Sequence, residues 1–299
     1  MNISIIGSNG FLAGSIGKYC NNMNYEVHSW GFSEEKNYQY STFHNVDLLN
    51  NEIDVEKLSQ SQIIIYAAGA GIQSNLNENF KAIYMMNTFV PIRIIKALNE
   101  LDFKGYIVTF GSYFELGENQ RDSFFTEEEI ITSVNPVPND YCVSKRLLTR
   151  FISSTKTNSK NYHFILPTIY GENENPKRLV PYIMSAVKNH QDLEFTAGSQ
   201  TRQYLYVDDV PPVIFNAIAE NIDSGVYNIA GDDNFEIREL VAVVLNHLNY
   251  PESNAHFGQT DKPDTGMKIL KLDDKLLKSK IGLNSKTKFI EVISKYLET

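Results

Sequence analysis

The hydrophobic positions in the first half of the chain form short strand-like runs that alternate with helix-like segments. The run 3–6 is apolar and leads through a glycine-containing turn into a helical pattern that ends near Asn22. The run 63–68 is continuously apolar, which is typical of a central parallel strand buried on both faces. Strands that alternate with helices predict a doubly wound, parallel α/β sheet. Other elements expected here are strands over 25–30, 41–47 and 105–110 and helices over 86–101 and 139–153.

The pattern beyond residue 162 is less regular and predicts a second, smaller region. Two later runs, 203–207 and 225–230, have strand patterns, and we expect both to return to the main sheet. We therefore assign residues 1–166 and 203–231 to the main region, and residues 167–202 and 232–299 to a discontinuous second region. Further expected elements are strands over 163–166 and 193–195 and helices over 180–189, 236–248 and 288–296.

Composition and charge exclude several classes of protein. The chain has 299 residues, and its 27 Lys and Arg against 36 Asp and Glu give a net charge of −9, which disfavours nucleic acid as a partner. No apolar run approaches the roughly 18 residues that span a bilayer, and the first residues lack a basic signal-peptide segment, so no membrane association is expected. Cys20 and Cys142 are too few for a disulfide framework and suit a reducing compartment, which predicts a cytoplasmic protein. The six histidines lack metal-ligand spacing, so no metal is expected.

A glycine turn follows the first strand and carries the first candidate chemistry. Gly7, Gly10 and Ala13 have the spacing G-x-x-G-x-x-A directly between a strand and a helix. Small residues there let the backbone and the helix N-terminus approach a pyrophosphate, so a dinucleotide site is predicted, with a tight turn that binds no ligand as the alternative. The cofactor contacts expected from this turn are Gly7, Asn9, Gly10, Phe11 and Leu12.

The end of the second strand bears on the choice between NAD and NADP. NAD-selective enzymes carry an acid there to bind the ribose hydroxyls, whereas residues 27–33 contain none. This absence favours NADP, although only Ser33 and Lys36 are present to hold a 2′-phosphate. NAD stays open, because a glutamate at 34 or 35 could reach a ribose. Asp47 and Leu48 follow the third strand and are expected to contact adenine, with a turn-capping role as the alternative for Asp47.

Three further residues predict an acid–base site. Tyr141 and Lys145 are four residues apart on a predicted helix and lie on one face of it. An ammonium group about 5 Å from a phenol would lower the phenol pKa by roughly two units at an effective dielectric constant near 20. Ser112 follows the strand over 105–110 at the sheet edge where doubly wound folds bind ligands. Tyr141 could therefore exchange a proton with a substrate oxygen that Ser112 holds, although an ordinary surface pair is the alternative for Tyr141 and Lys145 alone.

Other short motifs accompany these residues in a defined order along the chain. The full set comprises Gly7, Gly10 and Ala13, Asp47 and Leu48, Ala67, Ala68 and Gly69, Asn87 and Thr88, Ser112, Tyr141 and Lys145, and the segments 199–202 and 206–210. In this order the motifs resemble those of the extended short-chain dehydrogenase/reductases, which have a Rossmann fold. The likeness is to their NAD-dependent epimerase/dehydratase branch, which acts on nucleotide sugars, and it covers nearly the whole chain.

The resemblance implies a role for each matched residue. Tyr141 would be the acid–base residue, Lys145 would bind the nicotinamide ribose and lower the tyrosine pKa, and Ser112 would position the reacting oxygen. Arg202 would bind a phosphate of the substrate. The family pairs the helix that carries the tyrosine with its mate in dimers, which implies a homodimer. Implied cofactor contacts also include Tyr141 and Lys145 themselves and Ala67, Ala68, Gly69 and Asn87.

Several positions depart from the family pattern and narrow the expected chemistry. The 4,6-dehydratases of the family follow the catalytic hydroxyl residue with an Asp-Glu pair, whereas Tyr113 and Phe114 follow Ser112 here, which argues against dehydration. Thr168 stands where the family usually has asparagine. We expect Tyr113 and Thr168 to contact the sugar, with packing in the core as the alternative for Tyr113. Arg178 and Lys262 are expected to contact a diphosphate, with solvated surface positions as the alternative.

These features predict an enzyme that uses NADPH or NADH to reduce the C4 keto group of a nucleotide-linked 6-deoxy sugar. One alternative is a nucleotide-sugar 4-epimerase, which uses the same three residues and retains NAD through oxidation and re-reduction. A second alternative, from another class, is a protein that binds NAD(P) without turnover.

Overall fold

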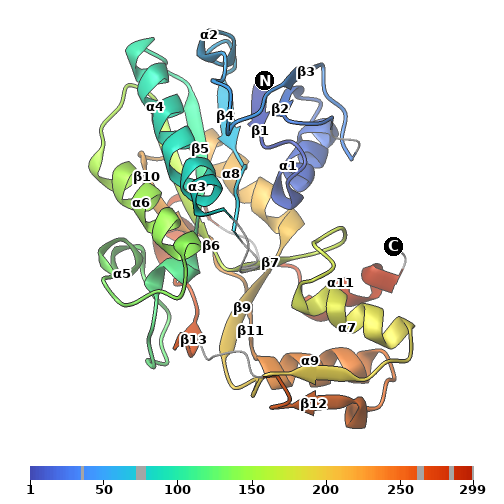
Figure 1. Cartoon of the computed structure of the whole chain (residues 1–299). Helices are drawn as coiled ribbons and strands as arrows, with labels where there is room; N and C mark the ends of the chain where they lie inside the picture. The colour runs from blue at the N-terminus through green and yellow to red at the C-terminus, as the bar shows by residue number, and fades with distance from the viewer. Residues whose placement is uncertain (35–36, 72–78, 261–265, 283–285, 298–299) are drawn as a thin grey trace.

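A seven-stranded parallel sheet lies at the centre of the computed structural model, which describes residues 1–34, 37–71, 79–260, 266–282 and 286–297 (Figure 1). The strand order is β10-β6-β5-β4-β1-β2-β3, and every neighbouring pair is parallel. The prediction of a doubly wound α/β sheet is therefore confirmed. The strands are β1 (Asn2–Ile6), β2 (Glu26–Gly31), β3 (Thr42–Asn45), β4 (Ile63–Tyr66), β5 (Tyr106–Ser112), β6 (Lys160–Leu166) and β10 (Gly225–Asn228).

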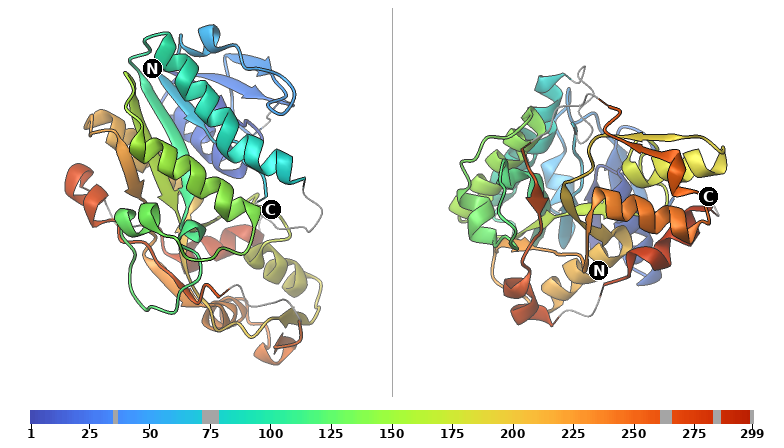
Figure 2. Two further views of the ribbon diagram at one scale, coloured as in Figure 1. Left: turned by 60° about the vertical axis from the view of Figure 1, so that its left-hand side comes forward. Right: turned by 90° about the horizontal axis from the view of Figure 1, so that it is seen from below.

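Both faces of the sheet are buried under helices, as the continuous apolar run of β4 predicts. Ile63 and Ile65 pack into one hydrophobic cluster with side chains of α1 and α8, and Ile64 and Tyr66 pack into a second cluster with side chains of α4 and α6. This alternation follows from the two-residue period of a strand. Figure 2 shows α4 and α6 side by side on one face. The helices are α1 (Phe11–Asn22), α8 (Val210–Ala219), α2 (Val55–Leu58), α4 (Val90–Glu100) and α6 (Asp140–Ser154).

The helix expected over 86–101 begins earlier and contains an irregular turn. It starts with α3 (Phe80–Tyr84), whose N-cap Asn79 accepts a hydrogen bond from the backbone N–H of Lys81, and it passes through a π-helical turn, η1 (Met85–Phe89), into α4. A π-turn adds a residue and shifts the apolar face, so a 3.6-residue pattern read from α4 does not extend back through it.

The smaller region is built on β9 (Thr201–Tyr206), and here the expected topology is wrong. Within the described residues β9 is the middle strand of a separate four-stranded sheet, paired antiparallel with β11 and parallel with β7 and β13. The run 203–207 therefore does not return to the main sheet, whereas the run 225–230 does, through β10. Gly231 permits this arrangement, because a Cβ at this position would lie 1.7 Å from the carbonyl oxygen of Tyr204. The remaining domain boundaries stay a prediction.

The other elements lie around this second sheet, pack against α6, α8 and β10 of the main region, or connect the two regions (Figure 1). Among the described residues, no helix is long and apolar enough to cross a membrane. The strands are β7 (Thr168–Tyr170), β8 (Leu193–Phe195), β11 (Asp233–Glu236), β12 (Ala255–Phe257) and β13 (Ile269–Leu270). The helices and 3₁₀ turns are α5 (Glu127–Thr132), α7 (Leu179–Lys188), α9 (Ile237–His247), α10 (Lys275–Ile281), α11 (Phe289–Ile293), η2 (Tyr113–Leu116), η3 (Val207–Asp209), η4 (Glu252–Asn254) and η5 (Ser294–Leu297).

Candidate active site

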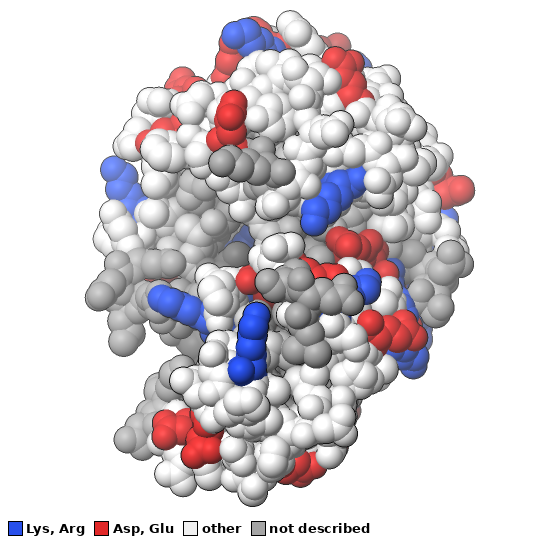
Figure 3. Space-filling view, turned by 90° about the vertical axis from the view of Figure 1, so that its right-hand side faces the viewer, with Lys and Arg blue, Asp and Glu red and all other residues white. Residues whose placement is uncertain are grey.

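A cavity of about 1560 Å³ lies between the carboxyl ends of the central strands and the smaller region. Its walls include the turn after β1, the ends of β4 and β5, the start of α6 and the loop that leads into α7. Figure 3 shows the molecule hollowed on the side where these elements meet, with Lys and Arg side chains near the opening. This volume exceeds that of most single-ligand pockets, so it can hold a dinucleotide and a second molecule together.

The turn after β1 places the start of α1 at the cavity. Gly7 has φ +91° and donates its N–H to the carbonyl of Trp30 at 2.8 Å, and its own carbonyl accepts the N–H of Gly10 at 2.9 Å. Gly10 is the N-cap, and no side chain of the described residues caps the helix there. The free N–H groups of the first turn and the helix dipole therefore favour an anion at this point. Gly7, Asn9, Gly10, Phe11 and Leu12 all line the cavity, and their contact with a pyrophosphate stays a prediction.

The second strand ends beside this turn, and Glu34, the described carboxylate nearest its end in sequence, is not among the residues that line the cavity. Ser33 lines the cavity and accepts a hydrogen bond from the amide of Asn9 at 2.5 Å. Glu34 is exposed, and residues 35 and 36, which include the candidate Lys36, lie outside the described residues. Asp47 and Leu48 line the cavity, but the Asp47 carboxylate also accepts hydrogen bonds from Leu49 N–H and from the Asn50 amide, which lower its pKa. The capping alternative for Asp47 is thus present, and the adenine contact stays a prediction.

The turn after β4 forms the cavity wall opposite α6. Ala67, Ala68 and Gly69 line it, and their contact with a cofactor stays a prediction. Asn87 lies outside the set of described residues that line the cavity, and its amide instead bonds to both the N–H and the carbonyl of Ala70 and to the hydroxyl of Ser144. Asn87 therefore ties this turn to α6 rather than facing the cavity.

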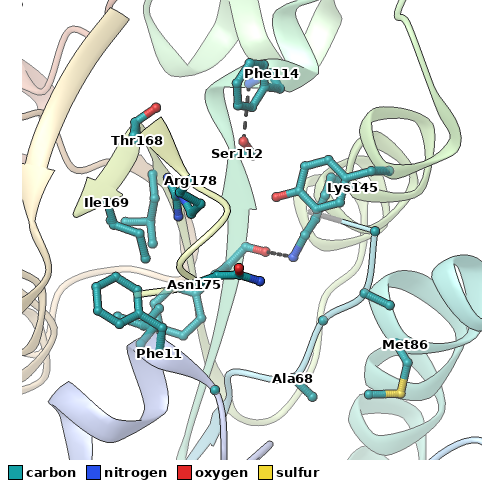
Figure 4. A pocket seen from close by; sticks show the side chains of 18 of the residues that line it. Phe11, Ala68, Met86, Ser112, Phe114, Lys145, Thr168, Ile169, Asn175 and Arg178 are labelled. Carbon is teal, nitrogen blue, oxygen red and sulfur yellow. Dashed lines mark hydrogen bonds between the residues drawn. The ribbon is translucent and has the colours of Figure 1, made fainter. Parts of the chain in front are cut away.

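Ser112, Tyr141 and Lys145 come together at the end of β5. Ser112 is the last residue of β5, and α6 carries the other two one turn apart, with Asn139 as its N-cap. The ammonium group of Lys145 donates to the carbonyl of Phe110 at 2.9 Å and lies 6.0 Å from the centroid of the Tyr141 ring. All three residues line the cavity, and Figure 4 shows Ser112 and Lys145 on the wall that faces Arg178.

The electrostatics of this group differ from the sequence-based expectation. Burial raises the pKa of Tyr141 above its ordinary value, and this effect outweighs a hydrogen bond with Ser112 and the charge of Arg178, which lower it. Burial also lowers the pKa of Lys145 to about 8. The predicted net fall of the Tyr141 pKa is therefore wrong for the protein alone, because burial disfavours the phenolate more than the neighbouring groups favour it. The Tyr141 phenol is protonated at neutral pH and is available as a proton donor.

The candidate substrate residues divide between the cavity and the core. Thr168, Arg178 and Arg202 line the cavity, whereas Lys262 lies outside the described residues. Tyr113 is buried in the core, where its hydroxyl is 2.6 Å from that of Thr168, so the packing alternative holds. The neighbouring Phe114 lines the cavity in its place, and the Arg202 guanidinium lies 5.9 Å from the centroid of its ring.

The sequence pattern did not predict three residues that lie near the site. Glu115 is fully buried behind Ser112, and Glu174 is buried beside Arg178, with 3.7 Å between its Oε2 and the arginine Nε. Tyr296 reaches the same loop from the far end of the chain, where it accepts the N–H of Gly171 and donates to Glu174. Ser112 and Glu115 form a capping box, and the S-x-x-E spacing was a signal for it. The contact of Tyr296 has no such local signal.

We expect the Glu174→Gln substitution to change how stability depends on pH. Burial raises the pKa of Glu174 from 4.5 to about 7, against the effects of Arg178 and Tyr296. Between these values the folded state binds more protons than the unfolded state, so this group's contribution to the unfolding free energy falls as pH rises and stays low above pH 7. At pH 8 the variant should be more stable than the wild type by about 1–3 kcal/mol, and at pH 4.5 it should lose this advantage.

Chemical denaturation of both proteins at pH 4.5, 6 and 8 measures the difference. Glu128→Gln removes an exposed carboxylate on α5 and should leave the difference from wild type flat with pH. A flat difference for Glu174→Gln as well would contradict the assignment.

The chain also matches a protein-family model and several known proteins. Residues 3–230 match the model of the NAD dependent epimerase/dehydratase family. A CDP-abequose synthase of Salmonella muenchen is 25% identical over 199 residues, which are 64% of this chain and 62% of that protein. A trifunctional UDP-glucose 4,6-dehydratase/UDP-4-keto-6-deoxy-D-glucose 3,5-epimerase/UDP-4-keto-L-rhamnose-reductase of Arabidopsis thaliana is 22% identical over 331 residues, 99% of this chain and 46% of that protein. The alignments thus cover less than two thirds of either relative.

Solved structures with the same fold are more distant in sequence. UDP-glucose 4-epimerase from Thermotoga maritima, solved with UDP-glucose, superposes with a TM-score of 0.85 at 17% identity and covers 100% of this chain and 99% of that one. A dTDP-glucose 4,6-dehydratase from Bacillus anthracis, solved with NAD, has a TM-score of 0.82 at 18% identity over 100% and 96% of the two chains. At these identities the likeness concerns the fold alone.

Proposed function

Because this chain belongs to the NAD dependent epimerase/dehydratase family, we propose that it uses a reduced nicotinamide cofactor to convert the C4 keto group of a nucleotide-linked 6-deoxy sugar into a hydroxyl. The observation that carries the proposal is the meeting of Ser112, Tyr141 and Lys145 in one cavity, with aromatic residues at 113 and 114. The carboxylates that a 4,6-dehydratase needs at those two positions are missing. The name of the plant relative includes a 4-keto sugar reductase, which is consistent with this reaction class.

The chain supplies a binding site and a proton to this reaction. The start of α1 and the small residues after β4 would hold the dinucleotide, which supplies hydride when bound. The protonated phenol of Tyr141 donates its proton to the C4 oxygen as that oxygen becomes an alkoxide, and the hydroxyl of Ser112 donates a hydrogen bond to the same oxygen. Lys145 carries the positive charge that stabilises the tyrosinate left behind.

We expect Arg178 and Arg202 to bind the diphosphate of the nucleotide sugar. Both line the cavity, and both belong to the smaller region rather than to the cofactor half. Arg202 is nearly buried, with 9% exposure, and its Nη1 donates to the carbonyl of Thr201 at 2.8 Å, which limits the orientation of the guanidinium. Paired guanidinium groups match the charge and geometry of phosphate oxygens.

A nucleotide-sugar 4-epimerase is the second candidate, since it needs the same three residues. Such an enzyme must first remove a proton from the substrate, whereas burial leaves Tyr141 protonated in the protein alone. In the protein without cofactor, Tyr141 is thus in the form that reduction requires. Binding of NAD(P) without turnover is a third candidate, and the assembled Ser112, Tyr141 and Lys145 argue against it.

The cofactor itself distinguishes these candidates. Freshly purified protein is denatured, any released nicotinamide nucleotide is identified by mass spectrometry, and the native protein is titrated with NADPH and NADH. A ketoreductase is expected to emerge largely empty and to bind the reduced cofactor reversibly. It should then oxidise that cofactor in the presence of a CDP-, dTDP- or UDP-linked 4-keto-6-deoxy sugar. Near-stoichiometric NAD that does not exchange would support the epimerase, and failure to bind either nucleotide would contradict both enzymes.

Three finer points belong to the same proposal. We expect a preference for NADP, because the described residues that line the cavity at the end of β2, Gly31, Phe32 and Ser33, include no acid. We expect a homodimer, because the adjacent helical segments η1 and α6 expose the large apolar side chains Phe89 and Leu147 to 50% and 43%. We place the protein in the cytoplasm, in keeping with the buried free thiols of Cys20 and Cys142.

A further inference from the structure

A buried carboxylate lies directly behind the proposed catalytic residues. The side chain of Glu115 is 0% exposed, its Oε1 accepts the backbone N–H of Ser112 at 2.7 Å and its Oε2 accepts the hydroxyl of Thr149 at 2.6 Å. Gly111 makes room for it, because a Cβ there would lie 2.6 Å from the Glu115 Oε1 and 2.7 Å from the His163 Nε2. Burying a carboxylate costs free energy unless its oxygens accept hydrogen bonds. Both oxygens of Glu115 do so, and one of the two donors is the backbone of Ser112.

The hydrogen bonds continue from Glu115 into the sheet and have a defined direction. The Thr149 hydroxyl lies 2.9 Å from His163 Nε2, and the Thr109 hydroxyl lies 2.7 Å from His163 Nδ1. An ionised carboxylate only accepts hydrogen bonds, so the Thr149 hydroxyl donates its single proton to the hydrogen bond with Glu115. His163 Nε2 must then donate to Thr149, and Nδ1 must accept from Thr109. The ionised state of Glu115 thus selects the Nε2–H tautomer of His163.

The same carboxylate acts electrostatically on the proposed catalytic pair. The titratable and charged groups that face it are Tyr141, Cys142, Lys145 and Arg146 from α6 and His163 from β6. Its negative charge raises the pKa of Lys145 and also raises that of Tyr141. Both effects favour the protonated forms, which are the forms that reduction requires.

We propose that Glu115 is a positioning residue that fixes the backbone of Ser112 and places a negative charge behind Tyr141 and Lys145, and that its ionised state selects the tautomer of His163 through the hydrogen-bonded chain Thr149–His163–Thr109. The part that concerns Tyr141 and Lys145 rests on the proposed function, whereas the hydrogen-bonded chain does not.

The hydrogen-bonded chain predicts that His163 changes its tautomer when Glu115 loses its charge. A protonated Glu115, or a glutamine, can donate to the Thr149 hydroxyl. Thr149 then donates to His163 Nε2, and His163 Nδ1–H donates to Thr109. Burial raises the pKa of Glu115 to about 7 and lowers that of His163 to about 3, so the imidazole stays neutral while Glu115 titrates. The tautomer change therefore occurs without formation of an imidazolium.

Nuclear magnetic resonance of the full chain labelled with ¹⁵N-histidine tests this without any substrate. His163 is assigned from the signal lost in His163→Asn, and the other five histidines serve as internal references. The Nε2–H tautomer is expected in the wild type at pH 9, and the Nδ1–H tautomer is expected in the wild type near pH 5.5 and in Glu115→Gln at both pH values. The wild-type titration decides the question even if Glu115→Gln does not fold. If His163 had the same tautomer in all samples, or were an imidazolium at pH 5.5, the proposed hydrogen-bonded chain would be wrong.

The catalytic part is tested by the pH dependence of kcat for keto-sugar reduction. Loss of the negative charge lowers the pKa of both Lys145 and Tyr141, so the basic limb of the Glu115→Gln profile should move to lower pH by about one unit. The exposed-carboxylate variant Glu128→Gln should keep the wild-type profile. A uniform fall of kcat without a shift of the limb would reduce Glu115 to a structural role and overturn this part. If the wild type reduces no keto sugar, the proposed function fails while the tautomer measurement still stands.

Discussion

Tyr141→Phe is expected to abolish turnover while leaving the affinity for NADPH unchanged. The substitution removes only the phenolic oxygen, and the aromatic ring remains to fill the wall of the cavity. Loss of a general acid costs about 10²–10⁴ in rate, because the C4 alkoxide must then take its proton from water. The measurement is the initial rate of NADPH oxidation with a 4-keto sugar, beside a titration of cofactor fluorescence with the same protein preparation.

Tyr25→Phe is the matched control for this substitution. Tyr25 packs against Phe215 at a centroid distance of 5.5 Å and lies outside the described lining of the cavity. Its loss of the hydroxyl should leave kcat within about twofold of wild type, in line with a surface substitution. If Tyr141→Phe retained wild-type kcat, Tyr141 would not be the proton donor. If the wild type and the variant were both inactive, the candidate that binds NAD(P) without turnover would gain support.

Gly7→Ala is expected to damage both the fold and the cofactor site. A Cβ on Gly7 would lie 2.5 Å from the backbone nitrogen of Ala68 and 2.6 Å from its Cα, and the residue has φ +91°. Neither the backbone conformation nor the contact with a neighbouring strand end can be relieved by a side-chain rotation. We expect a loss of about 2–4 kcal/mol of stability, and at least about a tenfold loss of NADPH affinity because the turn moves away from the pyrophosphate.

Gly14→Ala separates this effect from the general cost of replacing a glycine. Gly14 lies in α1, and a Cβ there would meet no atom of the described residues within 4 Å. Alanine is the better helix former by about 1 kcal/mol, so this variant should be as stable as the wild type or more so. Denaturant unfolding and cofactor titration of both variants provide the test, and equal behaviour of the two would refute the steric argument at Gly7.

Local spacing brought several of the predicted residues to the cavity, while their roles stay predictions. Gly7 and Gly10 line the cavity as their spacing after β1 indicates, and Tyr141 and Lys145 share a face of α6 because they are one helical turn apart. Ser112 reached the same place because it ends a strand, and the carboxyl ends of parallel strands share one edge. Each of these inferences needs only a few neighbouring residues.

Other expectations failed where the outcome depends on the surroundings of a residue. Tyr113 and Phe114 are adjacent aromatic residues, yet only the second lines the cavity, because the short turn η2 directs consecutive side chains to different sides. The pKa of Tyr141 depends on burial, which the i,i+4 spacing does not contain. Glu115 was missed although the capping-box spacing was visible, because the pattern does not tell whether a carboxylate is exposed or buried.

The sequence by itself determined the alternation of strands and helices, the glycine turn and the pairing of Tyr141 with Lys145, since all of these depend on periods of two to four residues. Only the tertiary structure decided that β9 leaves the main sheet, that Tyr296 meets the loop of Glu174 and Arg178, and that Glu115 lies behind Ser112. These outcomes depend on contacts between distant segments, such as the approach of Gly231 to Tyr204. The free energy of such contacts comes from burial and hydrogen bonding in the assembled core, which no short stretch of sequence specifies.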